Sequence, residues 1–364
     1  MRRRHIEDQR SQGRRALAVL PVHYPKELLT ALDILAVELW GPPGPPRGPG
    51  AGRVQAYVCP VVRNATAFIE AGHADGVDGL LFPHTCDSVQ GLATLAADFG
   101  LTRKPCFTFI HPKGEDRPAL RTFLRRELRA FADRLGAWVG RRVDADSLRR
   151  AIGLHRRIDA LRARLLDERR TVGLTDAELY GVLRRGEWQW PEAHLQELEA
   201  AVGTIRDETT QRGVPLFVTG YVPEPAGLLS HLEDAGAFVA ADDWAAVGRR
   251  VVRWGERPLP EDPWDALVEL RLASPPCSTQ GADQARRIDH LERLYLGSGA
   301  RGAILHMMKF CEPELFDLPA IRRRFERMGA PVLVLETELE GELSGQALTR
   351  LEAFVEMVGR RRAA

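Results

Sequence analysis

The feature that most constrains the fold is an alternation of short apolar runs with amphipathic stretches in the first third of the chain. Gln55–Val58, Gly79–Phe82 and Phe107–Ile110 are apolar runs of strand length. Between them, Ala65–Ala71 and Ser88–Phe99 have the spacing of amphipathic helices. Alternating strands and helices predict a parallel sheet with helices on its faces.

Further toward the N-terminus, the sequence offers two weaker signals. Lys26–Leu32 is predicted as the first helix, because Pro25 stands at the position where a helix commonly begins. The run of glycine and proline at Gly41–Pro46 fits neither a helix nor a sheet and predicts a surface loop.

From about Pro118 to Gln211 the strand signal disappears. Apolar residues recur there at helical spacing, which predicts about four helices. Thr175 and Glu178 form the pattern of a capping box at the start of one of them.

The alternation then resumes and extends to the end of the chain. A helix is predicted at Pro225–Ala235, and another at Ala285–Leu296. The predicted strands of this second series are Pro215–Val218, Phe238–Ala240, Ala303–His306 and Val332–Leu335.

These patterns predict an α/β protein with two Rossmann-like parallel-sheet domains and a helical segment between them. The expected boundaries are 1–117 for the first domain, 118–212 for the helical segment and 213–364 for the second domain. A chain of 364 residues exceeds one compact core, which agrees with this division. No short-period repeat is visible, but the two α/β halves could share one plan.

Composition excludes several classes of protein. Lys plus Arg number 51 against 50 Asp plus Glu, which argues against nucleic acid or an anionic membrane as the main partner. No stretch reaches the roughly 20 apolar residues of a membrane span, and no signal peptide pattern follows the first residues. We therefore expect a cytoplasmic protein whose five cysteines stay reduced, so that metal binding or catalysis is their expected role rather than disulfide formation.

Three of the cysteines, Cys59, Cys86 and Cys311, each follow a predicted strand. The carboxyl ends of parallel strands are where ligands bind in open α/β sheets, so facing domains would bring these thiols into one cleft. Thiolates are suited to iron–sulfur clusters, copper(I) and zinc. Because no Cys-x-x-Cys motif is present, the spacing alone leaves open that all three are ordinary buried thiols.

The remaining candidates have weaker support. Cys106 begins a predicted strand and is expected to be a buried apolar residue, and Cys277 is expected to pack or to line the cleft. Three histidines near strand ends are possible proton donors, although structural roles are the alternative; these are His84, His111 and His306.

The sequence contains no valid motif for binding a dinucleotide or for hydrolysing ATP. Gly297–Gly302 matches a dinucleotide-binding glycine pattern, but it follows a predicted helix and precedes a strand, the reverse of the required order. No P-loop pattern is present, so nothing in the sequence marks a site for ATP hydrolysis.

Five blocks of sequence, in order along nearly the whole chain, resemble the 2-hydroxyacyl-CoA dehydratase and benzoyl-CoA reductase family. The blocks are Pro25–Ala31 with Trp40-Gly41, Val77–Leu80 before Thr85–Ser88, Ser274–Ser278, Lys309–Pro313, and Gly345–Met357. The run Pro60–Arg63 departs from the family, because it is less polar than the serine-bearing run of many members.

The resemblance implies that Cys59, Cys86 and Cys311 hold a [4Fe-4S] cluster in the interdomain cleft. It also implies an acyl-CoA substrate, a homologous second subunit in a heterodimer, and a separate ATP-hydrolysing iron–sulfur activator protein. Members work anaerobically and place one electron on the thioester carbonyl. The resulting ketyl radical permits either dehydration of a 2-hydroxyacyl-CoA or reduction of an aromatic acyl-CoA.

Two other functions fit the same sequence. The chain could pair with itself as a double-cluster reductase of small molecules, or it could be a non-catalytic electron-transfer or scaffold subunit. The catalytic residues are not identified by the sequence.

Overall fold

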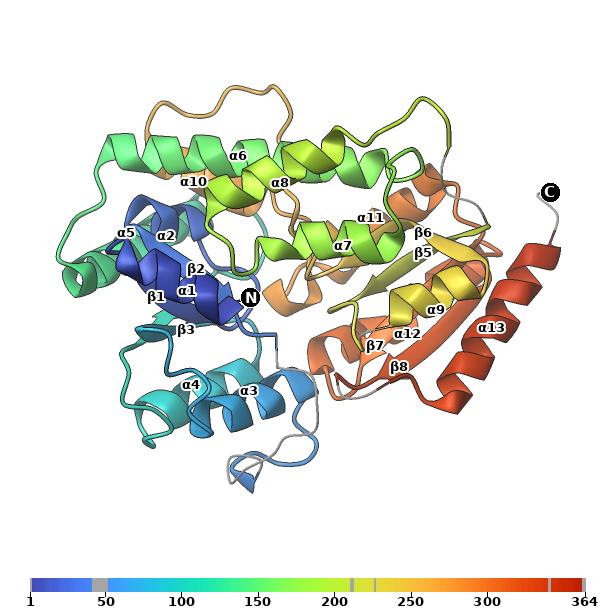
Figure 1. Cartoon of the computed structure of the whole chain (residues 1–364), viewed down its shortest axis with the longest axis horizontal. Coiled ribbons are helices and arrows are strands. Elements are labelled where there is room, and N and C mark those ends of the chain that lie inside the picture. The colour runs from blue at the N-terminus through green and yellow to red at the C-terminus, as the bar shows by residue number, and fades with distance from the viewer. Residues whose placement is uncertain (1, 41–51, 210–212, 226, 340–341, 362–364) are drawn as a thin grey trace.

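A computed structural model describes residues 2–40, 52–209, 213–225, 227–339 and 342–361. It contains two four-stranded parallel sheets, one from each end of the chain (Figure 1). Both the fold class and the number of predicted Rossmann-like sheets are confirmed. The predicted loop at Gly41–Pro46 lies outside the described residues.

The first sheet has the strand order β2-β1-β3-β4. Its central strand β3 is buried along its whole length, which explains the continuous apolar run that predicts it. The strands are β1 (Arg15–Val19), β2 (Ile34–Glu38), β3 (Gly79–Pro83) and β4 (Cys106–Phe109). The accompanying helices are α1 (Arg2–Ser11), α2 (Lys26–Ala31), α3 (Pro60–Glu70) and α4 (Asp87–Ala97).

The second sheet has the order β6-β5-β7-β8, which repeats the order of the first sheet strand for strand. The two halves therefore share one plan. In each sheet the strand order reverses beside the first strand, so ligand sites are expected at the ends of β1 and β3 and of β5 and β7. The strands are β5 (Val214–Gly220), β6 (Ala237–Trp244), β7 (Gly302–Met308) and β8 (Val332–Thr337).

Helices and two 3₁₀ turns accompany the second sheet in the chain. They are α9 (Leu228–Asp234), η2 (Gly248–Arg250), α10 (Pro263–Leu272), η3 (Ser278–Gln280), α11 (Gln284–Ser298), α12 (Glu312–Arg327) and α13 (Gly345–Arg360). The sequence Gly297–Gly302 joins α11 to β7, as predicted, so it is a helix end rather than a dinucleotide-binding loop.

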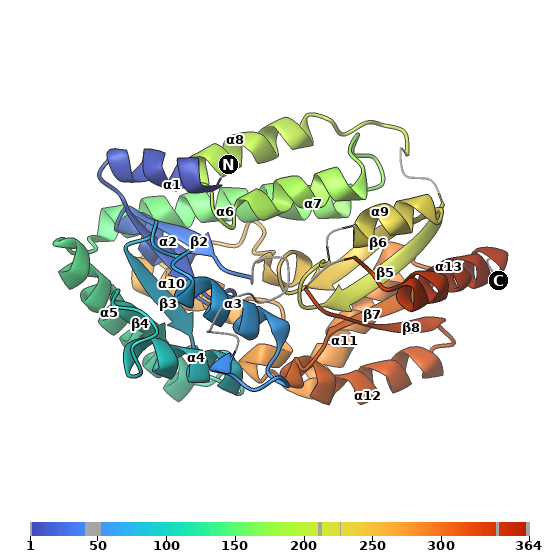
Figure 2. The same ribbon diagram turned by 60° about the horizontal axis from the view of Figure 1, so that its bottom comes forward.

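Four helices form the segment between the sheets, as predicted: α5 (Pro118–Val139), α6 (Ala145–Asp167), α7 (Asp176–Arg185) and α8 (Pro191–Val202). The capping box of Thr175 and Glu178 is present at the start of α7. Figures 1 and 2 show α6, α7 and α8 along one side of both sheets. Helix α6 contacts α2 of the first half, and α7 contacts α9 of the second.

Helix α10 does not pack with the sheet that flanks it in sequence. Its residues Ala266, Leu267 and Leu270 share a buried cluster with Leu17 of β1 and Leu128 of α5. Residues from the last third of the chain thus complete the buried cluster on one face of the first sheet, where α10 contacts α5 and α6. The helix begins at Asp262, whose carboxylate accepts hydrogen bonds from two first-turn amides.

The structure differs from the sequence-based prediction in several places. Helix α1 precedes the helix that was predicted as the first one, and α10 was not predicted. The predicted strand Gln55–Val58 is wrong, because residues 52–59 form turns and Tyr57 is 65% exposed. Strands β1 and β2 were not predicted, although both contain apolar runs. They flank the helix that was predicted at Lys26–Leu32.

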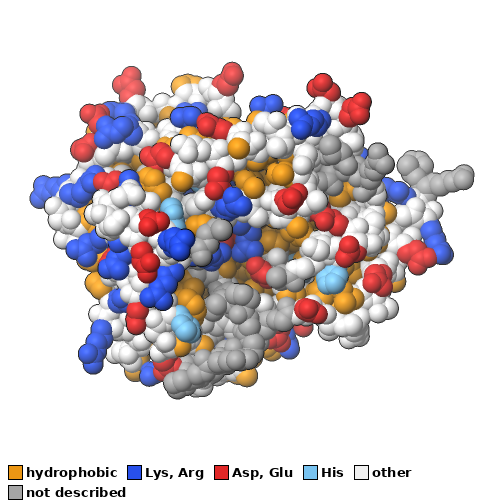
Figure 3. Space-filling view, viewed as in Figure 1, with side chains coloured by type: hydrophobic (Ala, Val, Ile, Leu, Met, Phe, Trp, Pro, Cys, Tyr) orange, Lys and Arg blue, Asp and Glu red, His pale blue; other side chains and the backbone are white. Residues whose placement is uncertain are grey.

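The charged residues are distributed as the balanced composition suggests. Figure 3 shows basic and acidic side chains interspersed over one face of the molecule. Among the described residues, no helix combines the length and the apolar character that a membrane span requires.

Asp176 provides a test of the packing between α7 and the second sheet. Its carboxylate accepts a hydrogen bond of 2.7 Å from the amide of Val239, and burial raises the pKa of Asp176 to about 6. The folded state thus holds this proton more tightly than the unfolded chain. The resulting stabilisation is complete below pH about 4 and is lost as the pH rises through about 6.

We expect Asp176→Asn to increase the free energy of unfolding at pH 7.5 by on the order of 2 kcal/mol and to have little effect near pH 4. Urea unfolding at both pH values would measure this. The exposed Asp146, in the first turn of α6, is the control, and Asp146→Asn should change neither value. An equal gain for Asp176→Asn at both pH values would contradict the assignment.

Candidate functional site

The carboxyl ends of the two sheets face each other, and side chains from both meet between them. Trp40 follows β2 and Tyr221 follows β5; their rings contact edge to face with centroids 5.3 Å apart. Arg63 of α3 pairs with Glu338 after β8 at 3.0 Å. These contacts join the two halves at the strand ends where the sequence predicts a site.

Cys59, Cys86 and Cys311 occupy equivalent positions, each as the residue that begins a helix. They precede α3, α4 and α12, respectively. Cys86 and Cys311 follow β3 and β7, as predicted. Cys59 does not follow a strand, since the predicted strand before it is absent, but Pro60 at the first helical position still places it at a helix start.

The three thiols lie close enough together to affect one another. Burial raises the pKa of Cys59 to about 12, and the neighbouring Cys86 acts in the same direction. Burial also raises the pKa of Cys311, with Glu314, Cys59 and Cys86 adding to the rise. Three thiolates could not share this space without a compensating positive charge.

The helix starts supply part of that compensation. The first-turn amides of Val62, Val89 and Glu314 act on the sulfurs of Cys59, Cys86 and Cys311 and favour their thiolates, although none forms a regular capping hydrogen bond. Partial positive charge at helix N-termini is the physical cause.

Tyr221 stands among these thiols, and it was not among the residues predicted from the sequence. Burial raises its pKa well above the ordinary value, and Cys86, Cys311, Cys59 and Cys277 all add to the rise. Tyr221 directly follows β5, so the strand-end rule that selected the cysteines could also have found it. We call the three helix-capping cysteines and Tyr221 the thiol site.

The three cysteines form a soft donor set, which suits iron–sulfur clusters, zinc and copper(I). Cys59 and Cys311 are buried, and Cys86 is partly buried. Amides of the helix starts act on all three sulfurs, and hydrogen bonds to the sulfurs are among the contacts that tune iron–sulfur clusters. Among the residues that the structure describes, no three His, Cys, Asp or Glu side chains are arranged as around one metal ion.

Cys311 is connected to a buried network through the next turn of its helix. Glu314 of α12 forms an ion pair with Arg249, which also pairs with Asp243 at 2.9 Å. Arg249 donates to the carbonyl of Gly220 at 2.9 Å and reaches the sulfur of Cys277 at 3.5 Å.

Gly220 must remain glycine for this arrangement. A Cβ there would lie 2.1 Å from the backbone oxygen of His306 on the neighbouring strand.

The other sequence candidates have different surroundings. Cys106 begins β4, as predicted, but it is half-buried rather than buried, and Cys277 is fully buried. His306 accepts from Trp244 at 3.1 Å and contacts Thr337 at 2.7 Å, so both ring nitrogens are used and its role is structural. His84 lies at the end of β3, and His111 lines a cavity between the sheets.

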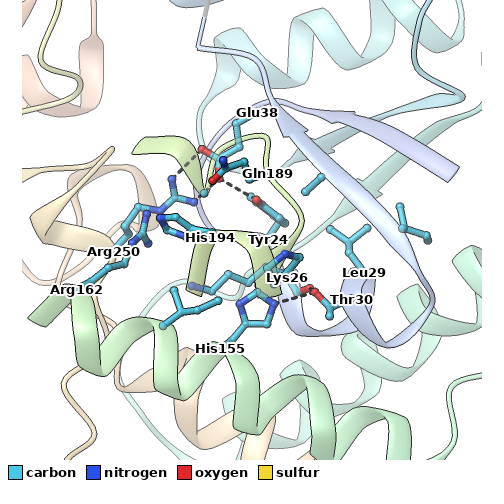
Figure 4. A pocket seen from close by; sticks show the side chains of 15 residues that line it. Tyr24, Lys26, Leu29, Thr30, Glu38, His155, Arg162, Gln189, His194 and Arg250 are labelled. Atoms are coloured by element: carbon cyan, nitrogen blue, oxygen red, sulfur yellow. Dashed lines mark hydrogen bonds and ion pairs between the residues drawn. The ribbon is translucent and has the colours of Figure 1, made fainter. Parts of the chain in front are cut away.

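Glu38, at the end of β2, forms a second buried junction. It accepts from Tyr24 at 2.8 Å and from Arg250 at 2.8 Å (Figure 4). It also accepts from Trp40 at 2.9 Å. Burial alone would raise the pKa of Glu38, but Arg250 and the other donors hold it below its usual range.

We expect Glu38→Gln to lower the free energy of unfolding by about 3 kcal/mol, because it leaves the Arg250 guanidinium buried without its counter-charge. Urea unfolding followed by tryptophan fluorescence would measure the loss. The double variant Glu38→Leu/Arg250→Met removes both charges and should be more stable than Glu38→Gln. If it loses as much stability as Glu38→Gln or more, the ion pair is not what stabilises this junction.

Comparisons with known proteins give matches along most of the chain. The family model for the 2-hydroxyglutaryl-CoA dehydratase D-component matches residues 21–358. The chain is 24% identical to the (R)-phenyllactyl-CoA dehydratase beta subunit of Clostridium sporogenes over 97% of this chain and 93% of that protein.

Two further relatives cover both kinds of reaction. The (R)-2-hydroxyglutaryl-CoA dehydratase beta subunit of Acidaminococcus fermentans is 24% identical over 95% of this chain and 93% of its own length. A benzoyl-CoA reductase subunit of Thauera aromatica is 24% identical over 88% of this chain and 85% of its own length.

Proposed function

Because the chain belongs to the 2-hydroxyglutaryl-CoA dehydratase D-component family, we propose that it is the iron–sulfur subunit of an anaerobic, ATP-dependent radical enzyme acting on acyl-CoA thioesters. The chain is of the 2-hydroxyacyl-CoA dehydratase or benzoyl-CoA reductase type. Its place of action in this proposal is the cytoplasm.

The observation that carries the proposal is the thiol site. Cysteines from both halves of the chain begin three helices and lie around one phenol. In the proposal, Cys59, Cys86 and Cys311 hold a [4Fe-4S] cluster. When bound, such a cluster supplies single electrons at low potential, which is the chemistry that a ketyl radical on a thioester carbonyl requires.

The protein's own residues would hold and shield this centre. Burial of Cys59 and Cys311 keeps water from the sulfurs, and the first-turn amides favour the thiolate form that binds iron. Arg249 positions α12 through Glu314, and so fixes Cys311 relative to the end of β5. Tyr221 borders the site, where its phenol and the thiols of Cys86, Cys311 and Cys59 raise one another's pKa.

The proposal includes two protein partners. The relatives are all named as subunits of larger enzymes, which supports a homologous second subunit for this chain. An ATP-hydrolysing iron–sulfur activator would deliver the electron, since the sequence has no P-loop of its own.

Iron content separates the proposed ligands from the other two thiols. We expect Cys59→Ala, Cys86→Ala and Cys311→Ala to lose the cluster, because each removes one iron ligand. Cys106→Ala and Cys277→Ala are the matched controls and should retain it. Iron and sulfide analysis with electron paramagnetic resonance after anaerobic purification would measure this, and equal iron in all five variants would refute the ligand assignment.

The need for partners is tested by activity. We expect the anaerobically purified chain, mixed with a chemical reductant and either benzoyl-CoA or a 2-hydroxyacyl-CoA, to show no sustained turnover. Addition of the second subunit, the activator and ATP should start the reaction. Turnover by the chain alone would instead favour a self-paired reductase. A complex that stays active when the three ligand cysteines are replaced would favour a non-catalytic subunit.

A further inference from the structure

A small cavity lies where the first half, the helical segment and the second half meet (Figure 4). We call it the junction cavity; its volume is about 40 Å³. Its charged and titratable lining comes from all three parts of the chain: Lys26 and Glu38, then His155, Arg162 and His194, then Arg250. The proposed cluster ligands are not among the described residues that line it, so it is separate from the thiol site.

Arg162 of α6 lines this cavity and has a buried charge without a partner. It is 4% exposed. Its Nη2 donates to the carbonyl of Leu183 at 2.7 Å, but Nε has no acceptor, and no ion pair joins Arg162 to a carboxylate of the described chain. A carboxylate pairs with each of the other arginines that are buried in the described ranges: Arg169, Arg249, Arg271 and Arg287.

Three carboxylates act on Arg162 from a longer distance, and each has a closer cation. The close pairs are Lys26 with Asp159 at 3.2 Å, Arg184 with Glu187 at 2.6 Å, and Arg250 with Glu38. These pairs balance their own charges and leave that of Arg162 uncompensated. Burial and the neighbouring Arg250 accordingly lower the pKa of Arg162, because both disfavour its charged form.

The two histidines of the wall are in a positive electrostatic potential. Burial lowers the pKa of His194 to about 3, and Arg162, Lys26 and Arg250 act in the same direction. Burial also lowers the pKa of His155 well below its ordinary value, and Lys26 and Arg162 again add to the effect. Figure 4 shows Lys26, Arg162 and His194 directed toward the same space. An anion is therefore favoured in this cavity over a cation.

Size restricts the occupant further. A water molecule needs about 10–15 Å³ of such volume, so the junction cavity holds roughly three waters or an ion of about four non-hydrogen atoms. Benzene occupies an engineered cavity of about 150 Å³, which is several times larger. Chloride and nitrate fit by this measure, whereas an aromatic or sugar carboxylate does not.

We infer that the junction cavity binds a small monovalent anion, which pairs with Arg162 and accepts a hydrogen bond from the ammonium group of Lys26. Lys26 has three N–H donors, of which Asp159 uses one. One negative charge neutralises the guanidinium, whereas water would only solvate it. The anion connects α2 to α6 and so stabilises the folded chain by mass action. The inference does not rest on the proposed function, since no cluster ligand takes part.

The first experiment measures urea unfolding of the anaerobically purified full-length chain in sodium gluconate, with chloride or nitrate replacing gluconate at constant ionic strength. Gluconate is too large for the cavity. We expect each tenfold increase in chloride above its dissociation constant to raise the folding equilibrium constant about tenfold. Nitrate should act in the same way.

Arg162→Met should abolish this dependence on chloride. In gluconate alone it should also unfold at a higher urea concentration than the unmodified protein, because it removes an uncompensated buried charge. The matched control is Arg157→Met, which removes the same charge from an exposed position of the same helix and should keep the full dependence. An equal response to chloride in the two variants would overturn the inference.

A second measurement locates the ion in the unmodified protein, so the test does not depend on whether Arg162→Met folds. Crystals soaked in sodium bromide should show an anomalous difference peak between the side chains of Lys26 and Arg162. Electron density for water alone in the cavity, without an anomalous peak, would contradict the inference.

Discussion

The guanidinium of Arg249 joins several elements of the second half at the ends of its strands, and its side chain is 1% exposed. It pairs with Asp243 at the end of β6 and with Glu314 in the first turn of α12, and it donates to the end of β5 at Gly220. A buried cation stabilises a fold only when its partners are all in place. The start of α12, and with it Cys311, is therefore fixed by one buried side chain.

Burial has opposite effects on the thiols and on the charged groups around them. It raises the pKa of Cys59 and Cys311, so the isolated thiols are protonated and inert, whereas Asp243 and Glu38 stay ionised because arginines compensate for the same burial. Arg63 and the first-turn amides lower the pKa of Cys59, but burial raises it by more. A bound metal would add the positive charge that favours the thiolates.

The elements that could be predicted from the sequence are those whose signal is local. Strands β3 and β7 are buried along their whole length and therefore appear as continuous apolar runs, and the capping box at Thr175 needs only four residues. The run Gln55–Val58 shows the limit of such prediction, because a short apolar stretch does not reveal whether a partner strand exists. The cysteines could be selected because chemistry limits which residues bind metals. The contact of His23 with Thr279 could not, since 256 positions separate them and only the packing of both halves brings them together.

Helix α10 contributes to the buried cluster on one face of the first sheet, although more than 150 residues separate it from the end of β4. The N-terminal sheet therefore cannot bury its full apolar face while the rest of the chain is still being synthesised. Until residue 272 has left the ribosome, Leu17 and Leu128 lack part of their final packing. The two halves share one strand order, but they do not complete their folding one after the other. The half that is synthesised first completes its core only when α10, from the half that is synthesised last, is available.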